Sequence, residues 1–168
     1  MKKTKSTKLT ELYLDEVKFE DGHQVHYVYF NYPESVAVVP ILDNKYIYLI
    51  KQYRYAIEQY SWEIPAGGVN EGESIQQAAL RELSEETSFD ADVVEYLFSF
   101  YPSNAMSNEK IHLFMADRFQ ATEHIRMQEL LERGIEVKRF RISEIQKMIT
   151  NQEITDAATI IGAQYFYS

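Results

Sequence analysis

A chain of 168 residues, 45% of them hydrophobic, is long enough for one domain with a real core. Its net charge of −9 argues against general binding to the nucleic-acid backbone, because such binding relies on Lys and Arg. The absence of Cys excludes disulfides and thiolate chemistry. The basic start MKKTKSTKLT is not followed by an apolar run, and no stretch approaches the roughly 18 apolar residues of a membrane span, so we expect a cytoplasmic protein.

Alternating apolar and polar residues predict β-strands in the first part of the chain. The dipeptide Asp21-Gly22 between two such runs favours a hairpin turn, and Asp43-Asn44 marks a second hairpin. The run from Val36 to Val39 is continuously apolar, as in a central strand. The strands predicted here span 12–19, 24–30, 35–42, 46–53 and 62–64.

The second part of the chain alternates between helices and strands. Apolar residues at helical spacing predict a helix from about Ser74 to Glu86, with Ser74 as its N-cap. The stretch 117–133 is polar and acidic and is expected to be mostly loop. Further strands are predicted at 91–100, 110–116 and 135–140, and further helices at 142–150 and 155–167. This mixture indicates an α+β fold, with a mixed sheet between helices and an N-terminal hairpin sheet appended.

The last turn of the helix at 74–86 carries Glu82, Glu85 and Glu86, which is an unfavourable place for carboxylates. The C-terminal end of a helix has partial negative charge, and acidic residues there cost a few tenths to about 1 kcal/mol each. Glu82 and Glu86 also repel each other as an i,i+4 pair. A divalent cation reverses the sign of these terms, and Mg²⁺ prefers carboxylate and phosphate oxygens. The helix end therefore predicts a metal site.

The segment GGVNEGESIQQAALRELSEETSF resembles the Nudix motif, G-x5-E-x7-R-E-U-x-E-E-x-G-U, in which U is a bulky aliphatic residue. One position departs from the motif, because Ser88 stands where the motif has a late glycine with positive φ. Serine can make that turn at a cost of about 1 kcal/mol, and no ligand is lost. The matching positions are Gly67, Glu73, Arg81, Glu82, Leu83, Glu85, Glu86 and Phe89.

Residues 36–165 resemble the ADP-ribose pyrophosphatase branch of the Nudix superfamily more specifically. The branch has a Q-Y-R segment before an E-[LI]-P-A-G lead into the motif, and here these are 52–54 and 63–67, with Pro102, EKIHLFMA and DAATIIGA downstream. The resemblance implies an α/β/α sandwich with a mixed sheet in a Nudix domain at 35–168. It also implies a homodimer, because N-terminal strands in this branch pack across to the partner, so 1–34 is expected to be an arm and hairpin for dimerisation.

The resemblance implies a metal-dependent hydrolase of diphosphate bonds. In the family, the metals bind to the motif glutamates and to a main-chain carbonyl just before the first glycine. The implied metal ligands are therefore Ala66, Glu82, Glu85 and Glu86, with Mg²⁺ as the expected cofactor and Mn²⁺ as a possible substitute. Arg81 is expected to pair with Glu73 or Glu85, and the glycines 67 and 68 to make a tight turn that brings backbone close to the helix.

Arg54 is the first candidate for substrate contact, because arginine binds phosphate bidentately and the branch has an arginine near the diphosphate. An ordinary surface ion pair is the alternative. Glu63 could bond a base or ribose edge, and Trp62 and Tyr60 could stack on adenine. A core or dimer role for Trp62 is equally open, and Tyr53 of the Q-Y-R segment completes the predicted substrate contacts.

The general base is expected in the acidic loop ATEHIRMQELLERGIEV, because in this branch a glutamate of a mobile loop activates the water. Glu132 is the first choice, Glu129 the second and Glu123 the third, while Glu136 lies in the following strand. The catalytic residues are thus predicted to be Glu132, Glu129, Glu85 and Arg81.

Three functions remain in competition at this stage. The first is hydrolysis of ADP-ribose, or of a related nucleoside diphosphate sugar, to a nucleoside monophosphate and a sugar phosphate. The second is hydrolysis of another nucleoside diphosphate derivative, such as a GDP-sugar or a dinucleotide. The third is a sensor that binds ADP-ribose without turnover, which the intact motif acids disfavour.

Overall fold

The computed structural model describes residues 11–121, 130 and 133–167. Its body is built on a seven-stranded sheet with the order β11-β4-β3-β9-β8, in which β5 also pairs with β4 and β6 with β3. The sheet is mixed, because β3 runs parallel to β9 while the other pairs are antiparallel. Its strands are β3 (Ser35–Leu42), β4 (Tyr46–Arg54), β5 (Gln59–Glu63), β6 (Ala66–Gly68), β8 (Glu95–Phe100), β9 (Ile111–Ala116) and β11 (Glu136–Arg141).

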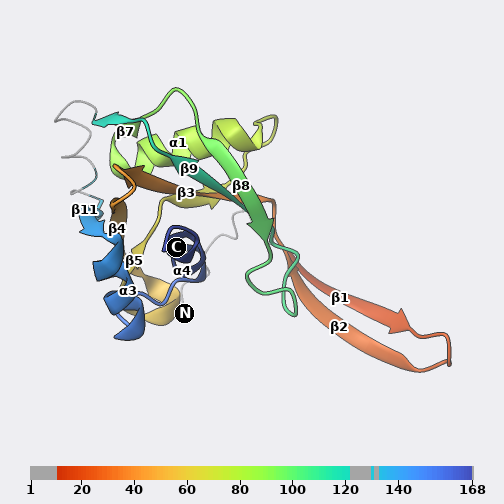
Figure 1. Cartoon of the computed structure of the whole chain (residues 1–168). Helices are drawn as coiled ribbons and strands as arrows, with labels where there is room; N and C mark the ends of the chain where they lie inside the picture. The colour runs from red at the N-terminus through yellow and green to blue at the C-terminus, as the bar shows by residue number, and fades with distance from the viewer. Residues whose placement is uncertain (1–10, 122–129, 131–132, 168) are drawn as a thin grey trace.

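Helices cover both faces of this sheet (Figure 1). Successive residues of β3 point to opposite faces, so Val36 and Val38 belong to the apolar cluster that contains α1 (Ile75–Thr87). Ala37 and Val39 belong to the cluster on the other face, with α3 (Ile142–Thr150) and α4 (Ala157–Tyr165). The predicted α/β/α sandwich is confirmed, and β3 is the central strand that its continuous apolar run indicated.

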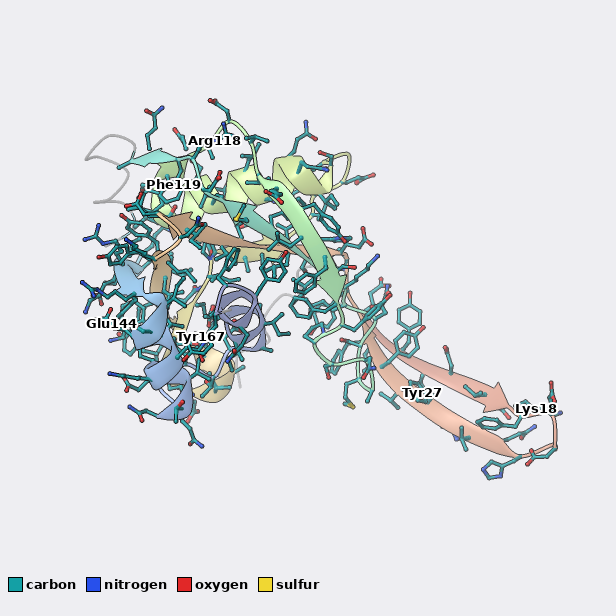
Figure 2. All side chains as sticks on the ribbon, viewed as in Figure 1. Lys18, Tyr27, Arg118, Phe119, Glu144 and Tyr167 are labelled. Atoms are coloured by element: carbon teal, nitrogen blue, oxygen red, sulfur yellow. The ribbon has the colours of Figure 1, made fainter. Side chains whose placement is uncertain are left out.

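Strands β1 (Glu11–Lys18) and β2 (Gln24–Asn31) form a separate antiparallel sheet. This ribbon extends away from the body, with Lys18 near its far end (Figures 1 and 2). The base of the ribbon is tied to the body, since the N–H of Phe30 donates to the carbonyl of Met106 at 2.9 Å. Leu12 and Leu14 are about two-thirds exposed, at 64% and 65%, so the ribbon presents apolar side chains to solvent.

Several predicted element bounds were wrong, because pairing with distant strands decides them. β5 begins at Gln59 rather than at residue 62, since it pairs with β4 from that point. Of the predicted strand 91–100, only Glu95–Phe100 is a strand (β8), and the short strand β7 (Phe89–Asp90) precedes it. β7 pairs with β10 (Gln120–Ala121), and β10 lies inside the stretch 117–133 that was expected to be mostly loop. The predicted tight turn at 67 and 68 is instead β6, which pairs with β3.

The helix ends follow local chemistry. Ser74 caps α1 as predicted, since its hydroxyl accepts from the N–H of Gln77 in a capping box. Ser88 ends the same helix with φ of 60°, so serine does adopt the left-handed turn where the Nudix motif has glycine. Asp156 caps α4, which begins two residues later than predicted. Among the described residues, no helix is long and apolar enough to cross a membrane.

Candidate active site

The acidic end of α1 lies directly against the backbone of β6. Pairing of Gly67 with Val36 holds β6 beside β3, and α1 packs on the same face of β3. A Cβ atom on Gly67 would lie 2.1 Å from Oε1 of Glu82, so only glycine leaves room for that carboxylate. The N–H of Ala66 donates to Oε2 of Glu86 at 3.0 Å. The expected close approach of backbone to the helix is therefore present, although it is made by a strand.

The two inward glutamates are held in an environment that disfavours their charge. Burial raises the pKa of Glu86 to about 7, and the neighbouring charge of Glu82 adds to this effect, while the bond from Ala66 opposes it. Burial also raises the pKa of Glu82, against the attraction of Arg81. Two buried carboxylates that repel each other suit a divalent cation, which removes both penalties. The residues present thus fit a divalent metal ion.

Arg81 organises the outer side of this helix end. Its guanidinium donates to both carboxylate oxygens of Glu73 at 2.9 Å and to the carbonyl of Gly68 at 2.9 Å. It also contacts Oε1 of Glu82 at 2.5 Å and Oε2 of Glu85 at 3.3 Å. The bonds from Arg81 lower the pKa of Glu73 to about 2. The predicted pairing of Arg81 with Glu73 or Glu85 is present and joins the loop to the helix, whereas a catalytic role of Arg81 stays a prediction.

Within residues 11–121, 130 and 133–167, no three acidic, His or Cys side chains form a ready-made metal cage. The hydrogen bonds explain this, because Arg81 attracts Glu82 and Glu85 while Ala66 engages Glu86. The side chain of Glu85 is 55% exposed, unlike that of Glu82 at 11%. Mg²⁺ commonly binds through one or two carboxylates plus substrate phosphates, so Glu82 and Glu86 remain the core of the predicted site.

Arg54 and Glu63 form an ion pair on the same face of the sheet as α1. The guanidinium of Arg54 binds Glu63 bidentately, and Gln52 donates to the same carboxylate at 3.2 Å. This bonding raises the pKa of Arg54, to which the charges of Glu86 and Asp156 also contribute. The side chain of Arg54 is 46% exposed while that of Glu63 is 7% exposed. The buried carboxylate of Glu63 therefore holds a guanidinium that is half open to solvent and close enough to Glu86 to be affected by its charge.

Trp62 and Tyr53 lie on the opposite face of the sheet. Side chains alternate along a strand, and Trp62 pairs with Lys51 whereas Glu63 pairs with Ile50. Trp62 contacts the ring of Phe140 edge-on at 5.0 Å. Tyr53 contacts Tyr60 edge-on at 5.5 Å. Both stay predictions as substrate contacts, and the register separates them from the Arg54–Glu63 pair.

The first three candidates for the general base, Glu132, Glu129 and Glu123, lie outside the described residues. Described neighbours of Glu132 do reach the site, since Arg133 donates to the carbonyl of Glu85 at 3.5 Å. Leu130 packs in a small apolar cluster with Ile50, the sheet partner of Glu63. Glu136 is in β11, exposed and opposite Lys51, and so on the face that carries Trp62.

Three residues near the site were missed by the sequence interpretation. Gln52 shares its strand face with Arg54, a position that alternation along β4 could have indicated. Asp156 and Thr159 have the spacing of an N-cap and its third helical residue, which was a local signal. Their link to the site is not local, because it depends on where α4 packs.

Known proteins resemble this chain in sequence and in fold. The model of the NUDIX domain matches residues 31–158, which is most of the chain. The chain belongs to the Nudix family. It is 33% identical over 161 residues to an ADP-ribose pyrophosphatase of Bacillus subtilis (strain 168), covering 95% of this chain and 86% of that protein. It is 31% identical over 160 residues to a methanol dehydrogenase activator of Bacillus methanolicus, with the same shares covered.

The crystal structure of an ADP compounds hydrolase has the same fold as this Nudix chain. The two superpose with a TM-score of 0.76, covering 95% of this chain and 85% of that one, at 21% sequence identity. The predicted class, a Nudix pyrophosphatase, is confirmed by the family and its relatives. The compound that this chain hydrolyses stays a prediction.

Proposed function

We propose that the protein hydrolyses the diphosphate bond of ADP-ribose or a related nucleoside diphosphate sugar, giving a nucleoside monophosphate and a sugar phosphate. The observation that carries the proposal is the buried pair Glu82 and Glu86, packed against β6 with Arg54 beside them. The name of the Bacillus subtilis relative, matched over 95% of this chain, supports the choice of substrate.

In this proposal Ala66, Glu82, Glu85 and Glu86 hold Mg²⁺, for which Mn²⁺ can substitute. When bound, the cation supplies charge neutralisation and a more acidic water. Arg54 engages one phosphate of the substrate, and Glu63 keeps its guanidinium oriented.

The bond that breaks joins the bridging oxygen to one phosphorus. The water oxygen bonds to that phosphorus, its proton goes to a base, and the bridging oxygen leaves with the other phosphate. Trp62 is proposed to stack on the base of the nucleotide, with Tyr53 as a further substrate contact.

Glu132 is the proposed general base, with Glu129 as the second choice. Support comes from both flanks of this segment, since Arg133 bonds the carbonyl of Glu85 and Leu130 packs against Ile50. We expect Glu132→Gln to lower kcat about 100-fold with little change in KM, because general-base catalysis contributes about 10²–10⁴-fold. A small loss at Glu132 with a large loss at Glu129 would move the assignment.

Residues 1–34 are proposed to be a dimerisation element attached to the Nudix domain at 35–168, in a cytoplasmic homodimer. The exposed apolar side chains of the β1–β2 ribbon support this, Leu12 and Leu14 above all. The Leu14→Asp variant should then shift the mass measured by light scattering from dimer to monomer. A monomeric wild type would reject the dimer.

The deciding experiment is a substrate panel assayed with Mg²⁺ and again with EDTA. The panel contains ADP-ribose, a GDP-sugar and a dinucleotide, and products are identified by chromatography. We expect AMP and ribose phosphate from ADP-ribose, and loss of turnover in EDTA. A preference for another compound would select the second function. The Bacillus methanolicus relative is a reason to test it, because its name differs from that of the Bacillus subtilis relative at similar identity. Binding of ADP-ribose without products would select the sensor.

A further inference from the structure

Between β5 and β6 the chain changes from one sheet neighbour to another. β5 pairs with β4 as far as Glu63, and β6 pairs with β3 from Ala66 onward. Ile64 and Pro65 make this crossing, and Pro65 has no N–H to donate. The crossing connects Glu63, whose carboxylate holds Arg54, to Ala66, whose N–H donates to Glu86. Its position therefore fixes the spacing between the phosphate-binding and metal-binding parts of the proposed site.

The crossing is held by a buried side chain of α4. The N–H of Ile64 donates to Oγ1 of Thr159 at 2.9 Å, and Thr159 is fully buried. The hydroxyl of Thr159 donates in turn to Oδ2 of Asp156 at 2.7 Å, and the same oxygen accepts the N–H of Thr159 at 2.8 Å. An ionised carboxylate only accepts, so the hydroxyl proton must point to Asp156 and leave a lone pair for Ile64.

The other side of the crossing is held by β3 and α1. The carbonyl of Pro65 accepts from the N–H of Val38 at 2.9 Å, and Ala66 donates to Glu86 at 3.0 Å. α1 and α4 lie on opposite faces of the sheet (Figure 1). Residues 64–66 thus connect a helix on one face of the sheet to a helix on the other.

We propose that the cap of α4, Asp156 with Thr159, is a positioning device for the active site, acting through the backbone of Ile64. This inference rests on the proposed function for its catalytic consequence. Neither side chain is a ligand. Their hydrogen-bonded chain fixes where Glu63 and Ala66 stand relative to each other, and the charge of Asp156 additionally acts on Arg54. Caps of this kind occur on many helices, but here the Thr159 hydroxyl also accepts the N–H of Ile64, which is 95 positions away in the sequence.

The test compares Thr159→Val, which keeps the shape and removes the hydroxyl, with Thr159→Ser, which keeps the hydroxyl. Three quantities are measured: hydrogen exchange of the Ile64 amide, the Kd for Mg²⁺ by calorimetry, and kcat and KM for ADP-ribose. We expect Thr159→Val to expose the Ile64 amide to exchange, weaken Mg²⁺ binding about tenfold and lower kcat more than it raises KM, because misplacing ligand-supporting groups costs about 10–100-fold. Thr159→Ser should stay close to the wild type.

Two further variants keep the test decisive. Asp156→Ala leaves the hydroxyl in place but frees its rotation, so a smaller loss in the same direction is expected. Ile145→Val removes a buried methyl group from α3 without touching the hydrogen-bonded chain, and it should lower the Tm while leaving the Kd for Mg²⁺ and kcat unchanged.

Two results would overturn the inference. One is a Thr159→Val protein with wild-type Kd for Mg²⁺ and wild-type kcat. The other is an equal loss in Ile145→Val, which would show that general destabilisation is responsible. A wild type that turns over no diphosphate would instead reject the proposed function, while the Mg²⁺ affinities of the variants still test the cap.

Discussion

Replacement of Glu86 by Gln should stabilise the metal-free protein at alkaline pH. The folded protein raises the pKa of Glu86 from 4.5 to about 7, chiefly through burial. At 1.36 kcal/mol per pKa unit, keeping this group ionised in the fold costs about 3 kcal/mol. The Gln side chain is neutral and its carbonyl can accept from Ala66, but burying an amide costs about 1 kcal/mol. The expected net gain is about 2 kcal/mol.

The sign of the pH dependence follows from the raised pKa. The folded state binds this proton more tightly than the unfolded state, so the contribution of Glu86 to stability is complete below pH 4.5 and is lost as pH rises through about 7. The gain from Glu86→Gln should therefore be small at pH 5 and complete at pH 8. For a chain of this length, about 2 kcal/mol raises the Tm by about 4–8 °C.

The assay is thermal and urea denaturation in EDTA at pH 5 and pH 8. Glu85→Gln is the matched control, because it makes the same change on the same helix end at an exposed side chain, and its effect should be small. Added Mg²⁺ should reverse the order by stabilising the wild type alone. Turnover of Glu86→Gln should fall about 100-fold or more. A variant no more stable than the wild type at pH 8, or equally stabilised at pH 5, would refute the reasoning.

Three further predictions concern the surroundings of this pair. Gly67→Ala should lower kcat about 100-fold, because the added Cβ would meet the carboxylate of Glu82. Gly68→Ala is the control and should leave kcat unchanged, since a Cβ there would meet no atom within 4 Å. Equal kcat values for the two variants would contradict this prediction. Ser88→Gly should raise the free energy of unfolding in urea by up to about 1 kcal/mol, since it relieves a positive φ; a loss of stability would argue against strain there. Glu73→Gln should lower stability by at most about 1 kcal/mol at pH 7. Because the pKa of Glu73 is lowered to about 2, the stability difference between the wild type and Glu73→Gln should shrink as pH falls from 5 to 3. If denaturation shows a constant difference over this range, the ion pair is not its source.

Local patterns in the sequence determined much of the framework. The cap at Ser74, the apolar face of α1 and the acidic last turn all depend on residues within a few positions of each other. The bounds of β3 follow from one continuous apolar run, and the prediction of 35–42 is confirmed. The pairing of Arg81 with Glu73 could also be anticipated, because the helix begins between them and brings both to one side.

Only the tertiary structure decided how these pieces meet. β5 and β6 are consecutive in sequence, yet they pair with different strands, and no local spacing encodes that change. The same register puts Glu63 beside Arg54 and Trp62 on the other face, although the two residues are neighbours. Thr159 reaches Ile64 because α4 packs on the sheet there. Sequence spacing fixes which residues share one element, whereas contacts between elements depend on the packing of the whole core.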